Sequence, residues 1–191
     1  MKATRFGGKI KSKSSLGGSA IIDRILEVYY SLFSEVILVT NTPEEFLQYK
    51  GCIKTPDILK GFGPVGGIHA AMRKSSLDSV FVIAGDMPFI DKYLVSEMVE
   101  RYSTMTVDAL VPLSDSGRQP LHAVYRNHLA GSIEEYLSGG NDRSVMGFLE
   151  IINVADYPVS REQEIEFMNI NTPADLSAAR EMERAKGRKI N

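Results

Sequence analysis

Several features that define other protein classes are scarce in this sequence of 191 residues. It has no tryptophan and a single cysteine, Cys52, which excludes an intrachain disulfide framework and a cysteine-based metal cage. No window holds the ~18 consecutive apolar residues of a membrane-spanning helix, so no membrane partner is expected. The formal net charge is −2, from 22 Lys and Arg against 24 Asp and Glu. This balance gives no basis for a generic nucleic-acid binder.

What is present is typical of a globular protein. Hydrophobic residues make up 43% and charged residues 24%, which predicts one domain over residues 1–191, with a flexible segment over 1–19 and a frayed tail over 186–191. The N-terminal residues lack the apolar segment of a secretory signal peptide. The basic, serine-rich start is similar to a transit peptide, but four glycines within residues 1–22 would break the required amphipathic helix. We therefore expect a cytoplasmic protein, as a monomer or a weak homo-oligomer.

Helical and strand patterns alternate along the chain. The spacing predicts helices over 20–33, 64–74, 91–102 and 127–137, with further helix starts at Thr42–Pro43 and Thr172–Pro173. It predicts strands over 35–40, 79–84, 107–113 and 121–125. The strands over 35–40 and 79–84 are short, β-branched apolar runs, so both are expected to be buried.

This alternation predicts an α/β fold with a three-layer α/β/α architecture and a mostly parallel sheet. The strands over 107–113 and 121–125 are too close for a helix to lie between them, so the sheet is expected to be partly mixed. Ligands of such sheets bind beyond the carboxyl ends of the strands, which directs attention to the residues that follow each apolar run.

Asp86 is the strongest candidate for a functional residue, because it lies in the segment Gly85–Pro88 directly after the strand predicted over 79–84. Mg²⁺ prefers one or two carboxylates together with phosphate oxygens. A carboxylate at the end of a central strand could hold that ion against a phosphate. Alternatively, Asp86 only caps the turn.

A basic, glycine-rich segment, Arg5–Lys11, lies near the start of the chain. Glycines free backbone N–H groups to face an anion, and Arg5 and Lys11 add positive charge for phosphate oxygens. The G-x-x-x-x-G-K-[ST] spacing of a P-loop is absent. Taken alone, the segment is more typical of a solvated tail.

A second glycine-rich loop, Gly61–Gly67, leads into the helix predicted over 64–74. Its glycines would let a base or a phosphate approach the backbone, or would serve a tight turn and close helix packing. Asp57 precedes this loop and is either a ligand contact or an ordinary turn residue.

Two amides precede the last predicted helix. Alternation places Asn169 and Asn171 on one face of an extended segment. Paired amides suit hydrogen bonding to a polar ligand. Alternatively, Asn171 and Thr172 only cap the helix.

Other reactive side chains carry weaker signals. His69, His122 and His128 lack metal-ligand spacing, and each is more typical of packing or of the surface. Cys52 lies in a short apolar stretch, as a buried hydrophobic residue would. Neither a G-x-S-x-G nor an H-E-x-x-H motif is present.

Taken in order, these segments resemble the molybdenum cofactor guanylyltransferases, a branch of the nucleotidyltransferase family. That family opens with a strand and the motif L-A-G-G-x-x-x-R-[MF]-G, followed by a lysine. Arg5–Gly8 resembles the end of this motif, and Lys11 falls at the lysine position. Further similar positions follow in order along the chain: Asn41, Asp57, Gly63–Gly67 (G-P-L-A-G in the family), Gly85–Phe89 (C-D-M-P-F), Gln119–Leu121 and Asn169–Pro173.

The resemblance implies a Rossmann-like nucleotidyltransferase that moves GMP from GTP to the terminal phosphate of molybdopterin and releases pyrophosphate. It implies three catalytic residues, Arg5, Lys11 and Asp86, with Mg²⁺ held by Asp86. The implied nucleotide contacts are Gly7, Lys11, Asn41, Asp57, Gly63, Gly67 and Asp86. The implied molybdopterin contacts are Asn169 and Asn171, and proteins that deliver the cofactor are implied partners.

The sequence departs from the family at its start. The first strand and the L-A-G-G half of the motif are missing, Ile10 stands where Asp is frequent, and Ser12–Ser15 is polar where the family is apolar. A missing strand would leave a gap or an exposed edge within the sheet and remove backbone donors for the triphosphate. Either the natural start lies upstream or the protein is degenerate, and in both cases we expect weak or no activity from the chain as it stands.

Other functions remain open. A related nucleotidyltransferase could use CTP with molybdopterin, or could act on cobinamide phosphate or a phosphosugar. The incomplete motif would suit a non-catalytic nucleotide-binding or partner-binding protein. The intact residues Asp86, Lys11, Asn169 and Asn171 disfavour that alternative. A glycosyltransferase-like protein ranks lowest, because no D-x-D triplet follows the strand predicted over 79–84.

Overall fold

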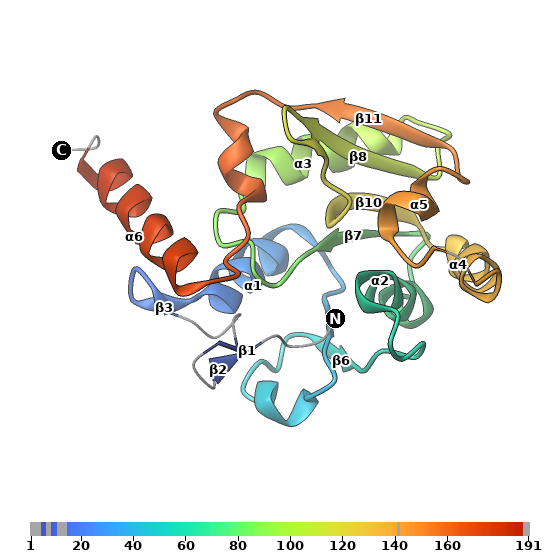
Figure 1. The fold of residues 1–191 in the computed structure, drawn as a ribbon, viewed down its shortest axis with the longest axis horizontal. Coiled ribbons are helices and arrows are strands. Elements are labelled where there is room, and N and C mark those ends of the chain that lie inside the picture. The colour runs from blue at the N-terminus through green and yellow to red at the C-terminus, as the bar shows by residue number, and fades with distance from the viewer. Residues whose placement is uncertain (1–4, 7–8, 11–14, 141, 189–191) are drawn as a thin grey trace.

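The computed structural model describes residues 5–6, 9–10, 15–140 and 142–188, and side chains over 15–140 and 142–185. Helices cover both faces of a central layer of strands (Figure 1). The predicted α/β class is therefore confirmed.

The helices fall close to their predicted positions. They are α1 (Ile21–Leu32), α2 (Gly63–Lys74), α3 (Lys92–Ser103), α4 (Leu129–Ser138), α5 (Val145–Leu149), α6 (Pro173–Arg188) and the 3-10 helices η2 (Pro43–Phe46) and η3 (Gln163–Phe167). The helix start predicted at Thr42–Pro43 yields only the single 3-10 turn η2, and the Thr42 side chain makes no cap hydrogen bond.

The strands include several that periodicity did not predict. They are β1 (Arg5–Phe6), β2 (Lys9–Ile10), β3 (Ser15–Leu16), β4 (Ser19–Ala20), β5 (Ile37–Val39), β6 (Ile53–Thr55), β7 (Ser79–Ile83), β8 (Ala109–Ser114), β9 (Gly117–Arg118), β10 (His122–Arg126) and β11 (Val154–Pro158). The unpredicted β6 and β11 are short, and β11 carries an internal aspartate and a proline, so neither shows a clear apolar pattern.

The main sheet has the strand order β11-β8-β10-β7, with β9 paired to β8. β10 is antiparallel to both β7 and β8, and β11 is parallel to β8. A mixed sheet is therefore confirmed. The prediction that it is mostly parallel is not, because β10 runs against both of its neighbours.

A second, parallel pair of strands, β5 and β6, stands apart from the main sheet. Its pairing extends at both ends: Thr40 N donates to Thr55 O at 2.9 Å, and Ile53 N donates to Val36 O at 2.8 Å. Within the described part of the chain, β5 pairs only with β6 and β7 pairs only with β10. The parallel and the mixed sheet are thus separate.

The strands of the main sheet pack helices on both sides. Alternate side chains of β8 and β10, including Val111 and Tyr125, pack against α2, α4 and α5. The residues between them, including Leu110 and Val124, pack with Phe167 and with residues of α3. This two-sided packing explains why apolar runs, rather than strict alternation, mark these strands.

Burial differs sharply among the apolar strands. The first four residues of β8 and the first four of β10 are buried. All five residues of β7 and all three of β5 are only half-buried. The prediction that 35–40 and 79–84 are buried strands is therefore wrong for β5 and β7, because an open space separates their facing edges.

The start of the chain is described in part. The hairpin β3–β4 carries the fully buried Leu16, and Arg180 Nη2 donates to the Ser15 carbonyl at 3.0 Å. Much of the segment predicted to be flexible, 1–19, lies outside the described residues, as does the end of the tail predicted over 186–191. No helix in the described ranges is long and apolar enough to cross a membrane.

Candidate active site

The ends of β5 and β7 meet the start of α2 at one cavity. This cavity, of about 110 Å³, is lined by residues that include Val39 at the end of β5, Gly85 just after β7, and Gly67 of α2. The predicted site positions Asn41, Asp57 and Asp86 come soon after these strand ends or after β6. The fold therefore brings together segments that lie far apart in the sequence.

Asn41 and Asp57 form a reciprocal pair across the ends of β5 and β6. Asn41 Nδ2 donates to Asp57 Oδ2 at 2.7 Å, and the Asp57 N–H donates to Asn41 Oδ1 at 3.0 Å. The parallel register that pairs Val39 with Thr55 brings the two residues side by side. Asp57 is only 6% exposed, so this pairing offsets the cost of burying its carboxylate.

Asp86 lies in the turn that follows β7 and is half-buried. The turn is closed by the Met87 N–H, which donates to the Ala84 carbonyl at 3.3 Å. The Ile170 N–H donates to the Asp86 carbonyl at 2.8 Å. This bond ties the Asn169–Asn171 segment to the Asp86 turn, so two predicted contact regions are joined.

The burial pattern of the 169–171 segment agrees with the predicted alternation. Ile170 is fully buried, while Asn169 is half-buried and Asn171 is exposed. The N–H groups of Asn171 and Thr172 both donate to Asp175 Oδ2, at 2.8 and 2.7 Å. The segment therefore also caps α6, so the structural alternative holds alongside any ligand role.

The glycine-rich loop runs into the first turn of α2. Gly63 has φ +55°, a left-handed conformation that favours glycine, and it is exposed. Gly66 is buried, and a Cβ there would lie 2.7 Å from the Leu59 carbonyl oxygen. Sequence reasoning chose Gly63 and Gly67 as contacts and gave Gly66 no separate role, although Gly66 packs closely against the backbone at Leu59.

The remaining predicted site residues are described only in part or not at all. Arg5 belongs to the hairpin β1–β2, and its side chain lies outside the described part of the structure. Gly7 and Lys11 also lie outside the described residues. The phosphate-binding role predicted for them therefore stays a prediction.

A magnesium ion fits the donor chemistry at Asp86. No cluster of three or more His, Cys, Asp or Glu side chains that could hold a metal occurs among the described residues. The side chains that the structure describes therefore do not enclose a metal ion by themselves. Mg²⁺ binds commonly through one or two carboxylates with phosphate oxygens completing the shell, which a single half-buried carboxylate can support.

The three histidines have structural partners instead of metal-site geometry. His122 is fully buried with its ring between those of Phe81 and Phe167, at centroid distances of 5.3 and 5.1 Å. Burial lowers the pKa of His122 to about 4, so the ring is neutral near pH 7. His128 is exposed and lies 3.4 Å from an Asp108 oxygen.

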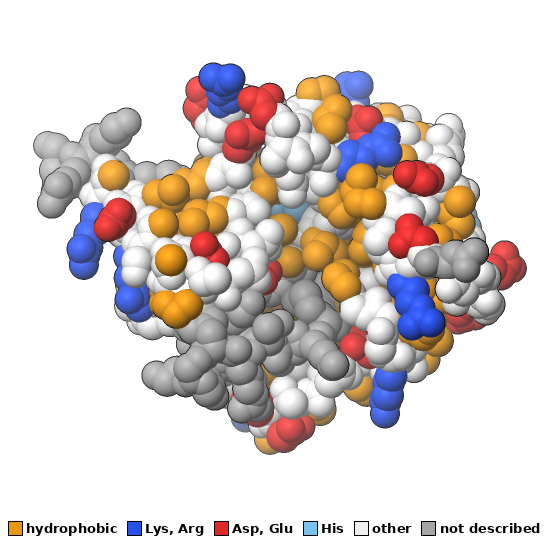
Figure 2. All heavy atoms as spheres, viewed as in Figure 1, with side chains coloured by type: hydrophobic (Ala, Val, Ile, Leu, Met, Phe, Trp, Pro, Cys, Tyr) orange, Lys and Arg blue, Asp and Glu red, His pale blue; other side chains and the backbone are white. Residues whose placement is uncertain are grey.

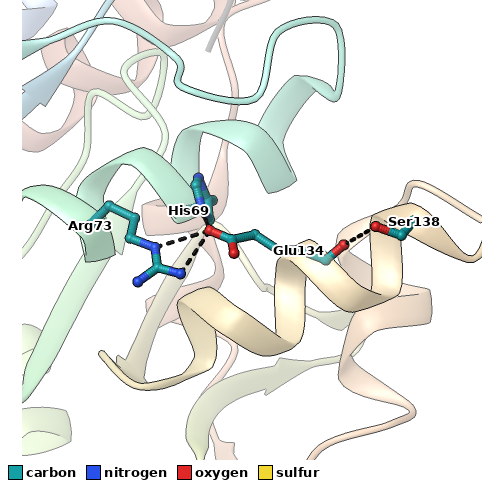
Figure 3. A network of polar contacts seen from close by, with 4 residues as sticks. All are labelled: His69, Arg73, Glu134 and Ser138. Carbon is teal, nitrogen blue, oxygen red and sulfur yellow. Dashed lines mark hydrogen bonds and ion pairs between the residues drawn. The ribbon is translucent and has the colours of Figure 1, made fainter.

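His69 belongs to a network that joins α2 to α4 (Figure 3). His69 Nε2 lies 2.7 Å from Glu134 Oε1, and Arg73 Nη2 donates to the same oxygen at 2.8 Å. These hydrogen bonds, from His69 first and then Arg73, lower the pKa of Glu134. The network cross-links two helices, and its residues do not line the cavity between the ends of β5 and β7.

Comparison with known proteins decides the family. A family model described as the MobA-like NTP transferase domain matches residues 2–153, which is well over half of the chain. The chain belongs to this family. The match spans Asn41, Asp57, the glycine-rich loop and Asp86, so most of the candidate site lies within the family domain.

Individual relatives of this MobA-like protein agree. The chain is 36% identical, over 92% of its length and 86% of the relative's, to a protein of Pelotomaculum thermopropionicum described as a probable molybdenum cofactor guanylyltransferase. It is 28% identical to the molybdenum cofactor guanylyltransferase of Desulfosudis oleivorans, over 93% of this chain and 89% of that one.

A solved structure gives the same result. Molybdopterin-guanine dinucleotide biosynthesis protein A from Archaeoglobus fulgidus superposes with a TM-score of 0.80 at 31% identity, covering 96% of this chain and 97% of that one. The predicted resemblance to molybdenum cofactor guanylyltransferases is therefore confirmed, together with the α/β nucleotidyltransferase fold.

Proposed function

We propose that this protein transfers GMP from GTP to the terminal phosphate of molybdopterin, releasing pyrophosphate. The observation that carries the proposal is the full-length match to the Archaeoglobus fulgidus protein, whose description names molybdopterin-guanine dinucleotide biosynthesis. Asn41, Asp57 and Asp86 each follow the end of a strand, β5, β6 and β7, which supports a nucleotide site at this edge of the strand layer.

The reaction needs little covalent chemistry from the protein. The molybdopterin phosphate attacks the α-phosphorus of GTP, a new phosphoanhydride forms, and the bond to the leaving pyrophosphate breaks. Catalysis of such transfers is mainly positioning and stabilisation of charge. No covalent enzyme intermediate is required.

Each candidate residue then has a distinct role. Arg5 and Lys11 hold the β- and γ-phosphates and stabilise pyrophosphate as it leaves. Gly7 and Gly63 let phosphate or base approach the backbone. The Asn41–Asp57 pair, held rigid by its two hydrogen bonds, contacts the nucleoside together with the loop that contains Gly67.

Asp86 would hold Mg²⁺, which when bound supplies positive charge to phosphate oxygens. Its position is fixed from both sides, by the end of β7 and by the hydrogen bond from the Ile170 N–H. The same bond links the backbone of the Asn169–Asn171 segment to the Asp86 turn. We propose that these two amides contact molybdopterin, and that delivery proteins supply and collect this labile substrate.

Selectivity for guanine over adenine would come from hydrogen-bond acceptors on the protein. The N–H groups of guanine need a carboxylate or a backbone carbonyl, which adenine cannot use in the same way. We propose that Asp57 and the carbonyls of the 61–67 loop supply these acceptors. We further propose that the 191 residues act as a single domain, as a monomer or a weak homo-oligomer, in the cytoplasm.

The test compares nucleotide binding by the wild-type protein and two matched variants. Asp86→Asn removes a carboxyl charge after β7, and Asp78→Asn removes one just before the other end of the same strand, where Asp78 is exposed. Thermal melting is measured with GTP, CTP or ATP, each with and without Mg²⁺. Bound ligand raises the melting temperature according to its concentration and affinity.

We expect a Mg²⁺-dependent shift with GTP alone, kept in Asp78→Asn and lost in Asp86→Asn. Where turnover of GTP with molybdopterin is measurable, Asp86→Asn should lower it about 100-fold or more, the scale of losing one electrostatic contact to the transition state. Equal shifts with CTP and GTP, or an Asp86→Asn protein that binds GTP and Mg²⁺ unchanged, would contradict the proposal.

A further inference from the structure

The loop that carries Asp86 is hydrogen-bonded near both of its ends to one distant segment. The Ile170 N–H donates to the Asp86 carbonyl at 2.8 Å, and the Asp91 N–H donates to Glu166 Oε2 at 3.3 Å. We call residues 86–91 the Asp86 loop and residues 166–170 the clamp segment. In Figure 1 the clamp segment leads from η3 to the start of α6, and the two hydrogen bonds place it against the loop that follows β7.

Glu166 is buried, although charged side chains next to it in the fold are exposed. Figure 2 shows acidic and basic side chains at the surface toward the top of the view, over η3 in Figure 1. Arg161 and Asp115, which form an ion pair next to η3, are 86% and 71% exposed. Glu166 is 4% exposed, and a carboxylate that loses its hydration needs hydrogen-bond donors in return. The Asp91 N–H is one such donor.

The hydrogen bond to Glu166 completes the cap of α3. Asp91 is the N-cap of this helix, and in a capping box the third helical residue is Glu or Gln, whose side chain accepts from the N-cap N–H. The third residue of α3 is Leu94, which is 1% exposed and carries no acceptor on its side chain. Glu166 supplies this acceptor from 75 residues away along the chain. The point where the Asp86 loop enters α3 is therefore fixed by η3.

An aromatic stack joins the clamp segment to β7 as well. The Phe167 ring lies 5.1 Å from the His122 ring, which in turn lies 5.3 Å from the ring of Phe81, measured between centroids. His122 on β10 pairs with Ile83, the last residue of β7. Edge-to-face rings at these distances attract one another beyond their buried area. This packing holds the clamp segment independently of Glu166, so a change at Glu166 need not detach it.

The direction of the Asp86 carboxylate depends on the backbone of its loop. The Asp86 carbonyl and the Asp91 N–H are both held by the clamp segment, so the residues between them connect two fixed points. Met87 is 2% exposed and Pro88 has a restricted backbone, which leaves the loop few other ways to connect these points. Groups that orient a metal ligand without touching the metal commonly lower metal affinity when they are removed.

We propose that Glu166 is a positioning residue for Asp86: by accepting from the Asp91 N–H it fixes the Asp86 loop and so sets the affinity for Mg²⁺ that binds together with GTP. The clamp segment also carries Asn169, the proposed molybdopterin contact, so one segment holds both the metal carboxylate and an acceptor contact in place. The inference rests on the proposed function, because the Mg²⁺ site at Asp86 is part of it.

Three variants separate this role from a purely structural one. Glu166→Leu removes the acceptor, and Glu166→Gln keeps an amide oxygen that can accept from the Asp91 N–H. Glu164→Leu is the matched control on the same helix, because Glu164 Oε1 also accepts from a backbone N–H, that of Asp115 in the β8–β9 turn, at 2.8 Å. The control therefore loses a comparable hydrogen bond that does not involve the Asp86 loop.

The measurement is binding of a fluorescent GTP analogue, followed by anisotropy over a series of Mg²⁺ concentrations at a temperature where every variant is folded. We expect Glu166→Leu to need about tenfold more Mg²⁺ for half-maximal binding, the scale of losing a group that orients a metal ligand. Glu166→Gln and Glu164→Leu should need the same Mg²⁺ concentration as the wild type. Binding measured without Mg²⁺ should be equal in all four proteins, which general damage to the fold would not allow.

Hydrogen exchange on the wild-type protein tests the proposal without any variant, so it still decides if Glu166→Leu does not fold. Mg²⁺ added to the protein with GTP should slow exchange of the backbone amides in the Asp86 loop and in the clamp segment together, while the amides of β11 stay unchanged. Slower exchange in the Asp86 loop alone would overturn the proposal, because the two segments would then not act as one unit.

The outcomes also separate this inference from the proposed function. An unchanged Mg²⁺ requirement in Glu166→Leu, an equal rise in Glu164→Leu, or a Glu166→Gln protein that behaves like Glu166→Leu would overturn the inference and leave the proposed function intact. A wild-type protein that does not bind GTP, or that binds it without any effect of Mg²⁺, would overturn both.

Discussion

Two parts of the strand layer have similar sequences but different surroundings. The run ALVPLS forms β8 and the run SVFVI forms β7, and both read as apolar strands. Five of the six β8 residues are buried, whereas every β7 residue is half-buried. The difference comes from the neighbours: β8 has strands on both sides, whereas β7 pairs only with β10 among the described residues and lines a cavity of about 110 Å³ together with β5.

This comparison shows what an apolar run does and does not encode. The run tells which residues favour a strand between two layers. It does not tell whether the strand is flanked on both sides, since that depends on segments elsewhere in the chain. The closed part around β8 and β10 should therefore carry most of the stability, and the open part around β5 and β7 should carry less.

The largest expected effect compares one leucine in each part. Leu110 of β8 is 1% exposed, so Leu110→Ala should lower the free energy of unfolding by about 2–5 kcal/mol. Leu38 of β5 is half-buried beside an existing cavity, so Leu38→Ala should cost less than half as much. Urea denaturation of both variants measures the difference, and equal losses would contradict the division into closed and open parts.

A second prediction uses the neutral histidine next to β7. Because burial lowers the pKa of His122 to about 4 from an ordinary 6.5, the unfolded chain binds more protons between these values. The stability due to the neutral ring is present above about pH 6.5 and is lost as the pH falls toward 4, by about 3 kcal/mol. His122→Leu should remove this loss.

The measurement is the free energy of unfolding at several pH values from 4.5 to 7.5, in wild type and His122→Leu. If the two proteins lose stability in parallel over this range, His122 is not held neutral. Such a result would show that the core beside β7 admits water.

A third prediction contrasts two helical glycines. Gly66→Ala places a Cβ 2.7 Å from the Leu59 carbonyl oxygen and should cost about 1–3 kcal/mol. Gly131 of α4 has open space around its Cβ position, so Gly131→Ala should stabilise by about 0.5–1 kcal/mol. Thermal melting measures whether each variant is less or more stable than the wild type. An unchanged melting temperature for Gly66→Ala would mean that the backbone at Leu59 can move away from α2 to admit the new methyl group.

The smallest effect is expected at the link between α2 and α4. Glu134→Gln weakens the hydrogen bonds to His69 and Arg73 at a partly exposed site, so we expect a smaller loss at pH 7 than for Gly66→Ala. The pKa of Glu134 is lowered in the folded protein. The stability that ionised Glu134 contributes is therefore full at pH values above the ordinary carboxyl pKa, and it is lost as the pH falls through the lowered pKa. Denaturation at pH 7 and at acid pH should show the gap between wild type and variant closing.

Much of the fold could be predicted from local signals. Apolar spacing of 3–4 residues located α1, and Asp91 caps α3 as predicted, accepting from the Tyr93 N–H at 2.8 Å. Thr172 and Asp175 form the predicted start of α6. These signals act within a few residues, so the sequence alone displays them.

The candidate site was predictable as a set of positions but not as a geometry. Asp86 follows an apolar strand, a local pattern. The hydrogen bonds between Asn41 and Asp57, and between Ile170 and Asp86, join segments 16 and 84 residues apart, and periodicity carries no information about such pairs. Gly66 has no room for a Cβ because the Leu59 carbonyl oxygen lies too close, and this contact depends on how the loop packs against α2.

The sequence by itself determined the α/β class, the positions of most helices, and the order of motifs that places the chain among MobA-like NTP transferases. Hydrophobic periodicity, helix caps and spaced motifs each depend on residues that are close together in the sequence, so they can be recognised without the structure. Only the tertiary structure decided that β10 runs antiparallel between β7 and β8, that β5 and β7 stand apart, and that Tyr29 lines the space between them. Strand neighbours and cavities arise from contacts between distant segments, and these exist only once the chain has folded.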